Sequence, residues 1–402
     1  MKRILLHAMI AFFAAVWAAM LPGSLVAQTG RWIPAWGTSQ DTYGTTTVSS
    51  RTVRMFARVS IGGQAVRIRL DNTFSPMPVT FATVYVGQQL VKRSGDSASR
   101  NARLIPGSNR QVFFAGSASV TIPPGGTVMS DPVTMAVRAE QDLGVSLYVP
   151  DSNVRPSSHT AAQTRSYMTA NAAGDLAADE SSTAFTSSTT TMFWLKGIDV
   201  MSSTARGSIV TLGDSITDGT CSTFDGHDRW HDWLMLRLAS LDGGAAKAIV
   251  NEGLSANTVT RTRTNSALDR LDRDVLSHDG ATDVILFEGT NDISRGVTKT
   301  QLIAGMQEII NRVKAEGLRI FGATILPRAD STWTSTKTQI RNEVNDWIRN
   351  GGAFDGVIDF DKATRDPGNV NVLYPPFNCD DIHPSPLGYV EMSKAISLTL
   401  VH

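Results

Sequence analysis

The stretch that decides the fold covers residues 208–219 and reads SIVTLGDSITDG. A short apolar run opens it, and a glycine, an aspartate and a serine then end that run abruptly. Four more short apolar runs follow, at residues 248–250, 284–287, 320–325 and 357–360. Amphipathic helical patterns lie between these runs, with apolar residues three and four positions apart. Alternating strands and helices predict an α/β fold, a doubly wound parallel sheet with helices on both faces.

The chain before this stretch has a different pattern. Apolar and polar residues alternate through 53–61 and again through 66–70, with Gly62 and Gly63 between them. This pattern predicts a β-hairpin with one buried face and a two-residue glycine turn. Further short strands are expected at 80–86, 118–122 and 145–149, each near a turn or a proline. Many short strands with such turns predict a β-sandwich-like domain.

Residues 151–190 are rich in serine, threonine and alanine and form the link between the two patterns. We interpret them as an irregular connector or as strands with a weak signal, and low-complexity disorder is the alternative. The expected organisation is therefore a β-sandwich-like domain with its connector over residues 28–200. The α/β domain follows over residues 205–402.

The first 27 residues have the features of a secretory signal peptide. Lys2 and Arg3 precede a long apolar run, and Ala27 offers a small residue at the expected cleavage site. The alternative is an uncleaved membrane anchor, because the apolar run approaches the length that spans a bilayer. We expect export with cleavage, a secreted or periplasmic location, and no stable membrane anchor on the mature chain.

Composition excludes several classes of protein. The chain has 402 residues, of which 42% are hydrophobic, so it can bury a sizeable core and is not disordered or fibrous. Lys+Arg and Asp+Glu both number 37, and this balance gives no general attraction to nucleic acid. The two cysteines cannot build a tetrahedral zinc site alone, but they can form one disulfide.

Polar residues with catalytic potential follow the ends of the predicted strands, where active sites of such sheets lie. Ser215 follows the first strand, and Gly253 follows the second. Asn291 lies shortly after the third, in the sequence EGTND. Asp380 and His383, three residues apart, follow the last strand. Each match alone is as readily explained by a helix cap, a turn or a surface loop.

Together, in this order, these residues resemble the four blocks of the SGNH/GDSL hydrolase superfamily, over residues 205–402. The resemblance implies a flavodoxin-like SGNH fold with Ser215 as the nucleophile and Asp380 with His383 as the catalytic dyad. It implies an oxyanion hole made by the backbone N–H groups of Ser215 and Gly253 and the side-chain amide of Asn291. Three such donors would stabilise the negative charge of a tetrahedral intermediate.

Two positions qualify this resemblance. Ala256 stands where many relatives have a second glycine, which leaves the local loop shape open, and Asp381 is a competing acid beside Asp380. The first 200 residues are similar to the β domain of two-domain members, a branch that includes acetyl-xylan-esterase-like enzymes. Trp32 and Trp36 in that region are candidates for a sugar-stacking platform, with buried core aromatics as the alternative.

Other catalytic chemistries have weaker support in the sequence. The chain contains no G-x-S-x-G elbow, no H-E-x-x-H motif and no glycine-rich phosphate loop. His227 and His231 are four residues apart and would share one helical face as metal ligands, but a solvated polar face is the favoured interpretation. We expect no metal and no organic cofactor.

The predicted function is that of an exported serine ester hydrolase that works through an acyl-enzyme. The expected partner is an ester substrate, and acetyl groups on a plant polysaccharide such as xylan are the first candidates. Lipid or aryl esters are the alternative substrates. A hypothesis of another class is a carbohydrate-binding protein with a degenerate hydrolase domain.

The cysteines give one further prediction. Cys221 lies six residues after Ser215, and Cys379 immediately precedes Asp380. If the serine and its dyad meet, the two sulfur atoms are neighbours, and export allows a bridge to persist. We therefore predict a Cys221–Cys379 disulfide, with two separate thiols as the alternative.

Overall fold

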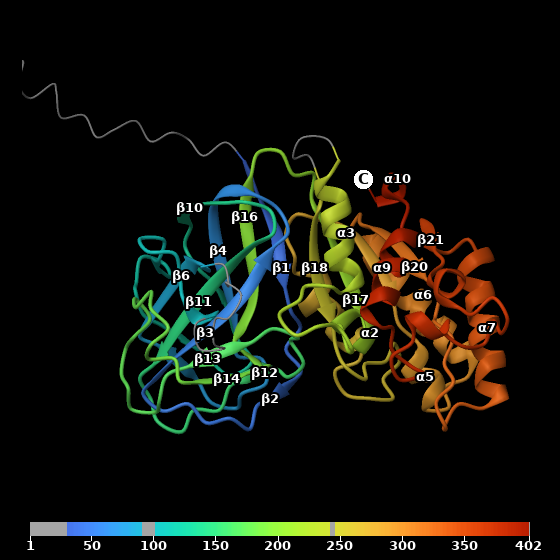
Figure 1. The fold of residues 1–402 in the computed structure, drawn as a ribbon, viewed down its shortest axis with the longest axis horizontal. Coiled ribbons are helices and arrows are strands. Elements are labelled where there is room, and N and C mark those ends of the chain that lie inside the picture. The colour runs from blue at the N-terminus through green and yellow to red at the C-terminus, as the bar shows by residue number, and fades with distance from the viewer. Residues whose placement is uncertain (1–29, 91–100, 242–245, 402) are drawn as a thin grey trace, which may run out of the picture. The chain divides into compact units, whose positions relative to one another are not determined.

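A parallel five-stranded sheet organises the second half of the chain in the computed structural model, which describes residues 30–90, 101–241 and 246–401 (Figure 1). The strand order is β18-β17-β19-β20-β21, so the first strand lies second and the chain winds outward in both directions. This is the flavodoxin-like order of a doubly wound sheet. The predicted fold class is confirmed. The strands are β17 (Ser208–Gly213), β18 (Ala248–Gly253), β19 (Ala281–Phe287), β20 (Arg319–Ala323) and β21 (Gly356–Ile358).

Helices cover both faces of this sheet because successive side chains of a strand point to opposite faces. Leu286 of β19 packs with helices α6 and α7, whereas Phe287 packs with α3 and α9. The helices are α2 (Ser215–Asp218), α3 (Trp230–Ala239), α4 (Ala267–Leu271), α5 (Thr290–Ser294), α6 (Lys299–Ala315), α7 (Ser335–Asn350), α8 (Phe360–Thr364), α9 (Pro386–Ala395) and α10 (Leu398–Val401). A π-helical turn η3 (Asp272–Leu276) and a 3-10 turn η4 (Pro375–Phe377) complete the region.

A strand-rich region precedes this sheet, as predicted. Its antiparallel sheets have the orders β1-β16-β4-β10, with β9 beside β4, then β14-β13-β3-β11-β6-β7, β15-β12-β2 and β5-β8. The strands are β1 (Arg31–Gly37), β2 (Thr42–Tyr43), β3 (Arg51–Val59), β4 (Gly63–Asp71), β5 (Val79–Phe81), β6 (Thr83–Gln88), β7 (Arg110–Val112), β8 (Val120–Ile122), β9 (Thr127–Met129), β10 (Val133–Val137), β11 (Gln141–Val149), β12 (Ser157–His159), β13 (Ser166–Met168), β14 (Ser187–Thr189), β15 (Met192–Phe193) and β16 (Leu195–Ser202).

The predicted hairpin over residues 53–70 is wrong. Its two strands, β3 and β4, do not pair with each other: β3 pairs with β11 and β13, whereas β4 pairs with β16, β10 and β9. Gly63 is needed for close packing rather than for a turn, since a Cβ there would lie 2.2 Å from the carbonyl oxygen of Met201 in β16. Arg54, a polar residue of the alternating run over 53–61, is fully buried and donates to Ser146 Oγ.

Residues 151–190 form short strands and turns, and so the interpretation as weakly signalled strands is correct for β12, β13 and β14. Residues 31–402 form one compact unit by their contacts, and the boundary at 200–205 between the two domains stays a prediction. The predicted signal peptide, residues 1–27, lies outside the described residues. Within the part of the chain that the structure describes, no helix has the length and hydropathy needed to cross a bilayer.

Two buried contacts join the strand-rich region to the parallel sheet. The hydroxyl of Ser60 accepts from the N–H of Ile249 at 2.9 Å, and its single proton is shared between the carbonyls of Ala35 at 2.7 Å and Ile249 at 3.2 Å. Ile249 lies in β18, an edge strand of the parallel sheet. Deeper in the interface, Lys196 of β16 contacts Glu252 at 3.2 Å and Asp274 at 2.5 Å, and all three side chains are at most 1% exposed. This buried ion network fixes the end of β18.

Candidate active site

Ser215 stands at the turn between β17 and α2, on the edge of the sheet where the parallel strands end. Gly213 makes this turn possible, because a Cβ there would lie 2.1 Å from Thr217 Oγ1. Asp214 caps the short helix: its side chain accepts from the N–H of Ile216 at 2.9 Å. The turn therefore holds the Ser215 side chain at the end of the strand while α2 leads away from it.

The structure brings Ser215, His383 and Asp380 into one chain of hydrogen bonds. Ser215 Oγ lies 2.8 Å from His383 Nε2, and His383 Nδ1 lies 2.8 Å from Asp380 Oδ2. The distances match a nucleophile, a base and an acid that orients the base. Asp380 contacts the imidazole through the three-residue spacing, whereas Asp381 accepts from Asn378 Nδ2 at 2.7 Å.

The environment keeps Asp380 ionised. Partial burial alone would raise the pKa of Asp380, but hydrogen bonds from the His383 N–H and ring outweigh it, so that the pKa is lowered. A carboxylate at this position stabilises the imidazolium that forms when His383 takes a proton. His383 is nearly buried, with 13% of its side chain exposed, whereas Asp380 is 44% exposed.

One of the three predicted oxyanion donors, the N–H of Gly253, already has an acceptor in the structure. The buried N–H of Gly253 donates to Asn251 Oδ1 at 2.9 Å, so it is already occupied. Three residues on, Ala256 is exposed and has a φ of 59°, and its N–H has no hydrogen-bond acceptor among the described residues. The N–H of Ser215 likewise has no acceptor there. The geometry therefore favours Ala256 over Gly253 as the donor from this loop.

Asn291, at the start of α5, reaches both neighbouring elements. Its Nδ2 donates to the carbonyl of Asn257 at 2.9 Å and lies 3.4 Å from Asp214 Oδ2. The amide is thus held between the loop that carries Ala256 and the residue that precedes Ser215. The sequence blocks that contain Ser215, Gly253 and Asn291 therefore lie next to one another. The fourth block supplies the dyad of Asp380 and His383.

One family model matches the part of the chain that carries this site. Residues 211–390 match the family described as GDSL-like Lipase/Acylhydrolase. We refer to residues 205–402 as the GDSL-like domain, after the family that residues 211–390 resemble. No curated protein matches the chain.

Solved structures similar to the GDSL-like domain each cover about half of the chain. A putative lipolytic protein of the G-D-S-L family from Desulfitobacterium hafniense is 21% identical over 48% of this chain and 97% of its own, with a TM-score of 0.38. An acetylxylan esterase from Geobacillus stearothermophilus is 19% identical over 48% and 92%, with a TM-score of 0.38. An aryl esterase from M. smegmatis is 19% identical over 47% and 95%, with a TM-score of 0.39.

A buried arginine that the sequence analysis did not single out holds the ends of two strands. Arg270 is fully buried and donates to the carbonyls of Gly213 at 3.0 Å and Glu252 at 2.6 Å. It also donates to Asn257 Oδ1 at 3.1 Å. Arg270 therefore sets the distance between the nucleophile turn and the oxyanion loop of the GDSL-like domain. Nothing in its local sequence distinguishes it from a helical surface arginine.

Buried acids lie beneath the nucleophile turn. Burial is the main cause that raises the pKa of Asp214 to about 7, with the nearby Asp292 carboxyl adding to it. Burial and the Asp214 carboxyl raise the pKa of Glu288 well above its usual range. These acids therefore hold protons at neutral pH more readily than surface carboxyls do, which reduces the negative charge under Ser215.

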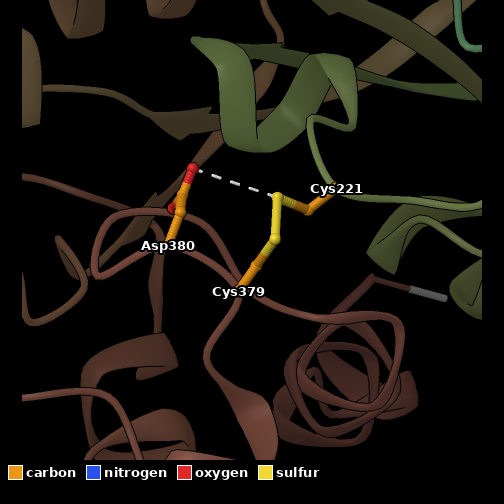
Figure 2. Close-up of side chains that lie close together, drawn as sticks. All are labelled: Cys221, Cys379 and Asp380. Atoms are coloured by element: carbon orange, nitrogen blue, oxygen red, sulfur yellow. Dashed lines mark hydrogen bonds between the residues drawn. A yellow bond between two sulfur atoms is a disulfide. The ribbon is translucent and has the colours of Figure 1, made fainter.

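A disulfide joins the loops that carry the nucleophile and the dyad (Figure 2). Cys221 and Cys379 are bonded, with their Cα atoms 6.5 Å apart, and Cys221 Sγ lies 4.0 Å from Asp380 Oδ2. A second link runs beside it, because the Tyr389 hydroxyl donates to the carbonyl of Thr220 at 2.6 Å. The GDSL-like domain thus has a covalent and a polar connection between Ser215 and His383.

The two histidines considered as metal ligands do not share a helical face. His227 precedes α3, and its Nε2 lies 3.4 Å from Asp142 Oδ1. His231 lies inside α3, and its Nε2 lies 3.2 Å from the carbonyl of Thr217. Among the described residues, the one group with metal-ligand spacing is Cys221, Cys379 and Asp380, whose sulfur atoms are consumed by the disulfide.

Proposed function

We propose that the protein hydrolyses carboxylic esters through an acyl-enzyme on Ser215. His383 Nε2 takes the hydroxyl proton as Ser215 Oγ attacks the ester carbonyl carbon, and Asp380 holds the imidazolium that results. Collapse of the tetrahedral intermediate releases the alcohol, which takes the proton from His383. A water molecule, deprotonated by the same histidine, then releases the acid. The carrying observation is the 2.8 Å contact between Ser215 Oγ and His383 Nε2.

We assign the oxyanion to three donors: the N–H groups of Ser215 and Ala256 and the Asn291 amide, whose second N–H makes only a long contact of 3.4 Å to Asp214 Oδ2. The free N–H groups of the first two support this set, and the occupied N–H of Gly253 speaks against the set derived from the resemblance. Gly253 instead allows close packing, because a Cβ there would lie 2.3 Å from the backbone nitrogen of Asp218.

The test of the assignment is the Ser215→Ala variant, assayed with 4-nitrophenyl acetate. We expect turnover to fall by several orders of magnitude with an unchanged thermal melt, because a single hydroxyl contributes little to the core. Ser240→Ala, an exposed serine at the end of α3, is the matched control and should keep full activity. Near-wild-type hydrolysis by Ser215→Ala would exclude the proposed mechanism.

For the substrate, we propose acetyl esters of a carbohydrate. A cavity of about 350 Å³ adjoins the oxyanion loop and is lined from both regions, by Asp41 and Phe74 on one side and Ser255, Asn257 and Arg263 on the other. Asp41 Oδ1 has no hydrogen-bond partner among the described residues. Carboxylate, amide and guanidinium groups around one aromatic ring suit a hydroxyl-rich alcohol better than an acyl chain.

The substrate proposal is tested by Arg263→Ala against Arg261→Ala, its exposed neighbour, which does not line this cavity. We expect Arg263→Ala to raise the KM for acetylated xylo-oligosaccharides more than the KM for 4-nitrophenyl acetate. Arg263 also donates to the carbonyl of Ser255 at 2.9 Å, so a fall in kcat that both substrates share reports the oxyanion loop and not the cavity. Faster hydrolysis of long-chain acyl esters than of any acetylated glycan would favour the lipid-ester alternative. Absence of hydrolysis with every ester would favour the degenerate carbohydrate-binding protein.

We further propose that the protein acts outside the cytoplasm, either secreted or in the periplasm. The signal-peptide pattern of residues 1–27 and the disulfide support this location, because disulfides persist in oxidising compartments. N-terminal sequencing of the protein recovered from culture medium and periplasm tests it, and a cytoplasmic chain with an intact N-terminus would contradict it.

A further inference from the structure

A buried histidine of the strand-rich region contacts the nucleophile helix. His159 ends β12, is 2% exposed, and lies with Nε2 3.0 Å from Asp218 Oδ1. Asp218 is the last residue of α2, the helix that Ser215 begins, and is 2% exposed. The other ring nitrogen, Nδ1, lies 2.7 Å from the carbonyl oxygen of Ser39. The imidazole therefore fills the space between the strand-rich region and the turn that carries the nucleophile.

The contacts of His159 require a proton on both nitrogens. A carbonyl oxygen only accepts, so Nδ1 donates to Ser39, and a lone pair on Nε2 would then face the Asp218 carboxylate. Burial lowers the pKa of His159, but the Asp218 carboxylate and the Ser39 carbonyl outweigh burial and raise the pKa to about 9. At neutral pH the pair is a buried imidazolium and carboxylate, which fixes the position of the Asp218 side chain.

The second oxygen of Asp218 holds the oxyanion loop. Asp218 Oδ2 accepts from the Ser255 N–H at 3.1 Å and from Ser255 Oγ at 2.8 Å. Ser255 immediately precedes Ala256, whose φ of 59° is a conformation that side chains other than glycine adopt at a cost. Two hydrogen bonds to a fixed carboxylate offset that cost and hold Ser255, whose carbonyl begins the peptide group that ends in the Ala256 N–H.

We propose that His159 is a positioning residue for ester hydrolysis, acting through Asp218 and Ser255 on the oxyanion donor Ala256. The inference rests on the proposed function and adds a role for the strand-rich region: it supplies the charge that sets the oxyanion loop. Among the described residues, the hydrogen-bond partners of His159 are Ser39 and Asp218 and not the reacting serine or the dyad, so it affects charge stabilisation and leaves proton transfer by His383 intact. Displacement of a catalytic donor by about 1 Å costs on the order of 10²-fold in rate.

The first experiment compares His159→Gln with His278→Gln on 4-nitrophenyl acetate. His278 is the matched control: it is 4% exposed and its Nε2 lies 2.8 Å from Glu252 Oε1. This second buried histidine–carboxylate pair lies at the end of β18 and makes no hydrogen bond to Asp218 or Ser255 among the described residues. Both variants should melt at lower temperature. We expect kcat to fall about 10²-fold in His159→Gln alone, with KM within about twofold of wild type. Wild-type kcat in His159→Gln, or an equal loss in His278→Gln, would overturn the proposal.

The second experiment measures coupling along the proposed path. An alkyl boronic acid forms a tetrahedral adduct with a catalytic serine and places an oxygen in the oxyanion site, so its Ki should rise in step with the loss of kcat. Ser255→Ala should lower kcat as well, and the double variant should lose less than the product of the single losses. Multiplicative losses, or a wild-type Ki in His159→Gln, would overturn the proposal.

The design separates this proposal from the proposed function and from misfolding. If Ser215→Ala retains activity, ester hydrolysis on Ser215 fails whatever His159 does. If His159→Gln does not fold, Ser255→Ala alone decides, because Ser255 lies partly exposed on the loop and loses only its Oγ contact to Asp218. Unchanged kcat and Ki in Ser255→Ala would then refute the path through Asp218.

Discussion

Removal of the disulfide by the double substitution Cys221→Ser and Cys379→Ser should lower stability far more than activity. The bridge joins residues 158 positions apart. Closing a loop of this length removes conformational entropy from the unfolded chain that corresponds to about 5 kcal/mol at 25 °C on the chain-entropy model. With an unfolding entropy typical of about 370 folded residues, this upper value corresponds to a fall in Tm of about 6 °C.

The smaller effect on activity follows from the contacts that remain. The Tyr389 hydroxyl still holds the carbonyl of Thr220, and Tyr389 is fully buried. Asp380 still accepts from the His383 backbone N–H at 2.8 Å, so the dyad keeps its local shape. We expect kcat for 4-nitrophenyl acetate to stay within about tenfold of wild type.

The assay is chemical denaturation of wild type and variant, each with and without a thiol reductant. The reductant should lower the denaturation midpoint of the wild type to that of the variant. It should leave the midpoint of the variant unchanged, so the variant is the control for other effects of the reductant. The reasoning is refuted if the variant's unfolding free energy equals that of the oxidised wild type. Two free thiols per chain in the denatured, unreduced wild type would refute the bridge itself.

Three further predictions concern charge. Asn291→Ala should lower kcat by about 10²–10³-fold with a small change in KM, because its amide serves charge that develops in the transition state; a loss confined to KM would make it a binding residue. The raised pKa of His159, about 9 against 6.5 unfolded, gives stability that is complete below pH 6.5 and lost as pH rises through 9, about 3 kcal/mol in all. Denaturant titrations should show that decline in wild type, and its persistence in His159→Gln would contradict the assignment. Lys196→Met leaves Glu252 and Asp274 without their shared cation and should lower the unfolding free energy by about 3–5 kcal/mol in the same titrations. An unchanged unfolding free energy would show that other groups compensate the two carboxylates.

The sequence was most informative where a local pattern determines a local structure. The five apolar runs gave the parallel strands because a buried strand needs apolar side chains on both faces, and all five became β17 to β21. The residues at the strand ends came together because parallel strands end at one edge. Ser215, Asp380 and His383 are therefore adjacent in the structure although 168 residues separate the serine from the histidine.

The sequence did not reveal which strands pair with each other or which distant groups contact a given side chain. Alternation of apolar and polar residues predicts a strand but not the strand beside it. The hairpin prediction therefore paired β3 with β4, although β3 pairs with β11 and β4 pairs with β16. The family resemblance implied Gly253 as an oxyanion donor, yet the Asn251 side chain accepts a hydrogen bond from that N–H. His159 and Arg270 were missed because their roles depend on carboxylates and carbonyls distant in the chain.

The hydroxyl of Ser60, bonded to both the N–H and the carbonyl of Ile249, has a consequence for any attempt to shorten the chain. β18 is an edge strand, and an uncovered edge offers its backbone to a second molecule. In the full chain Ser60 and β1 shield this edge, and Gly37 at the end of β1 approaches Val250 so closely that a Cβ would lie 2.5 Å from its side chain. A fragment that begins at residue 205 would retain every residue of the proposed triad and yet would present β18 as a template for self-association. The first half of the chain therefore protects the β18 edge from aggregation, and an engineered form of the protein should retain it.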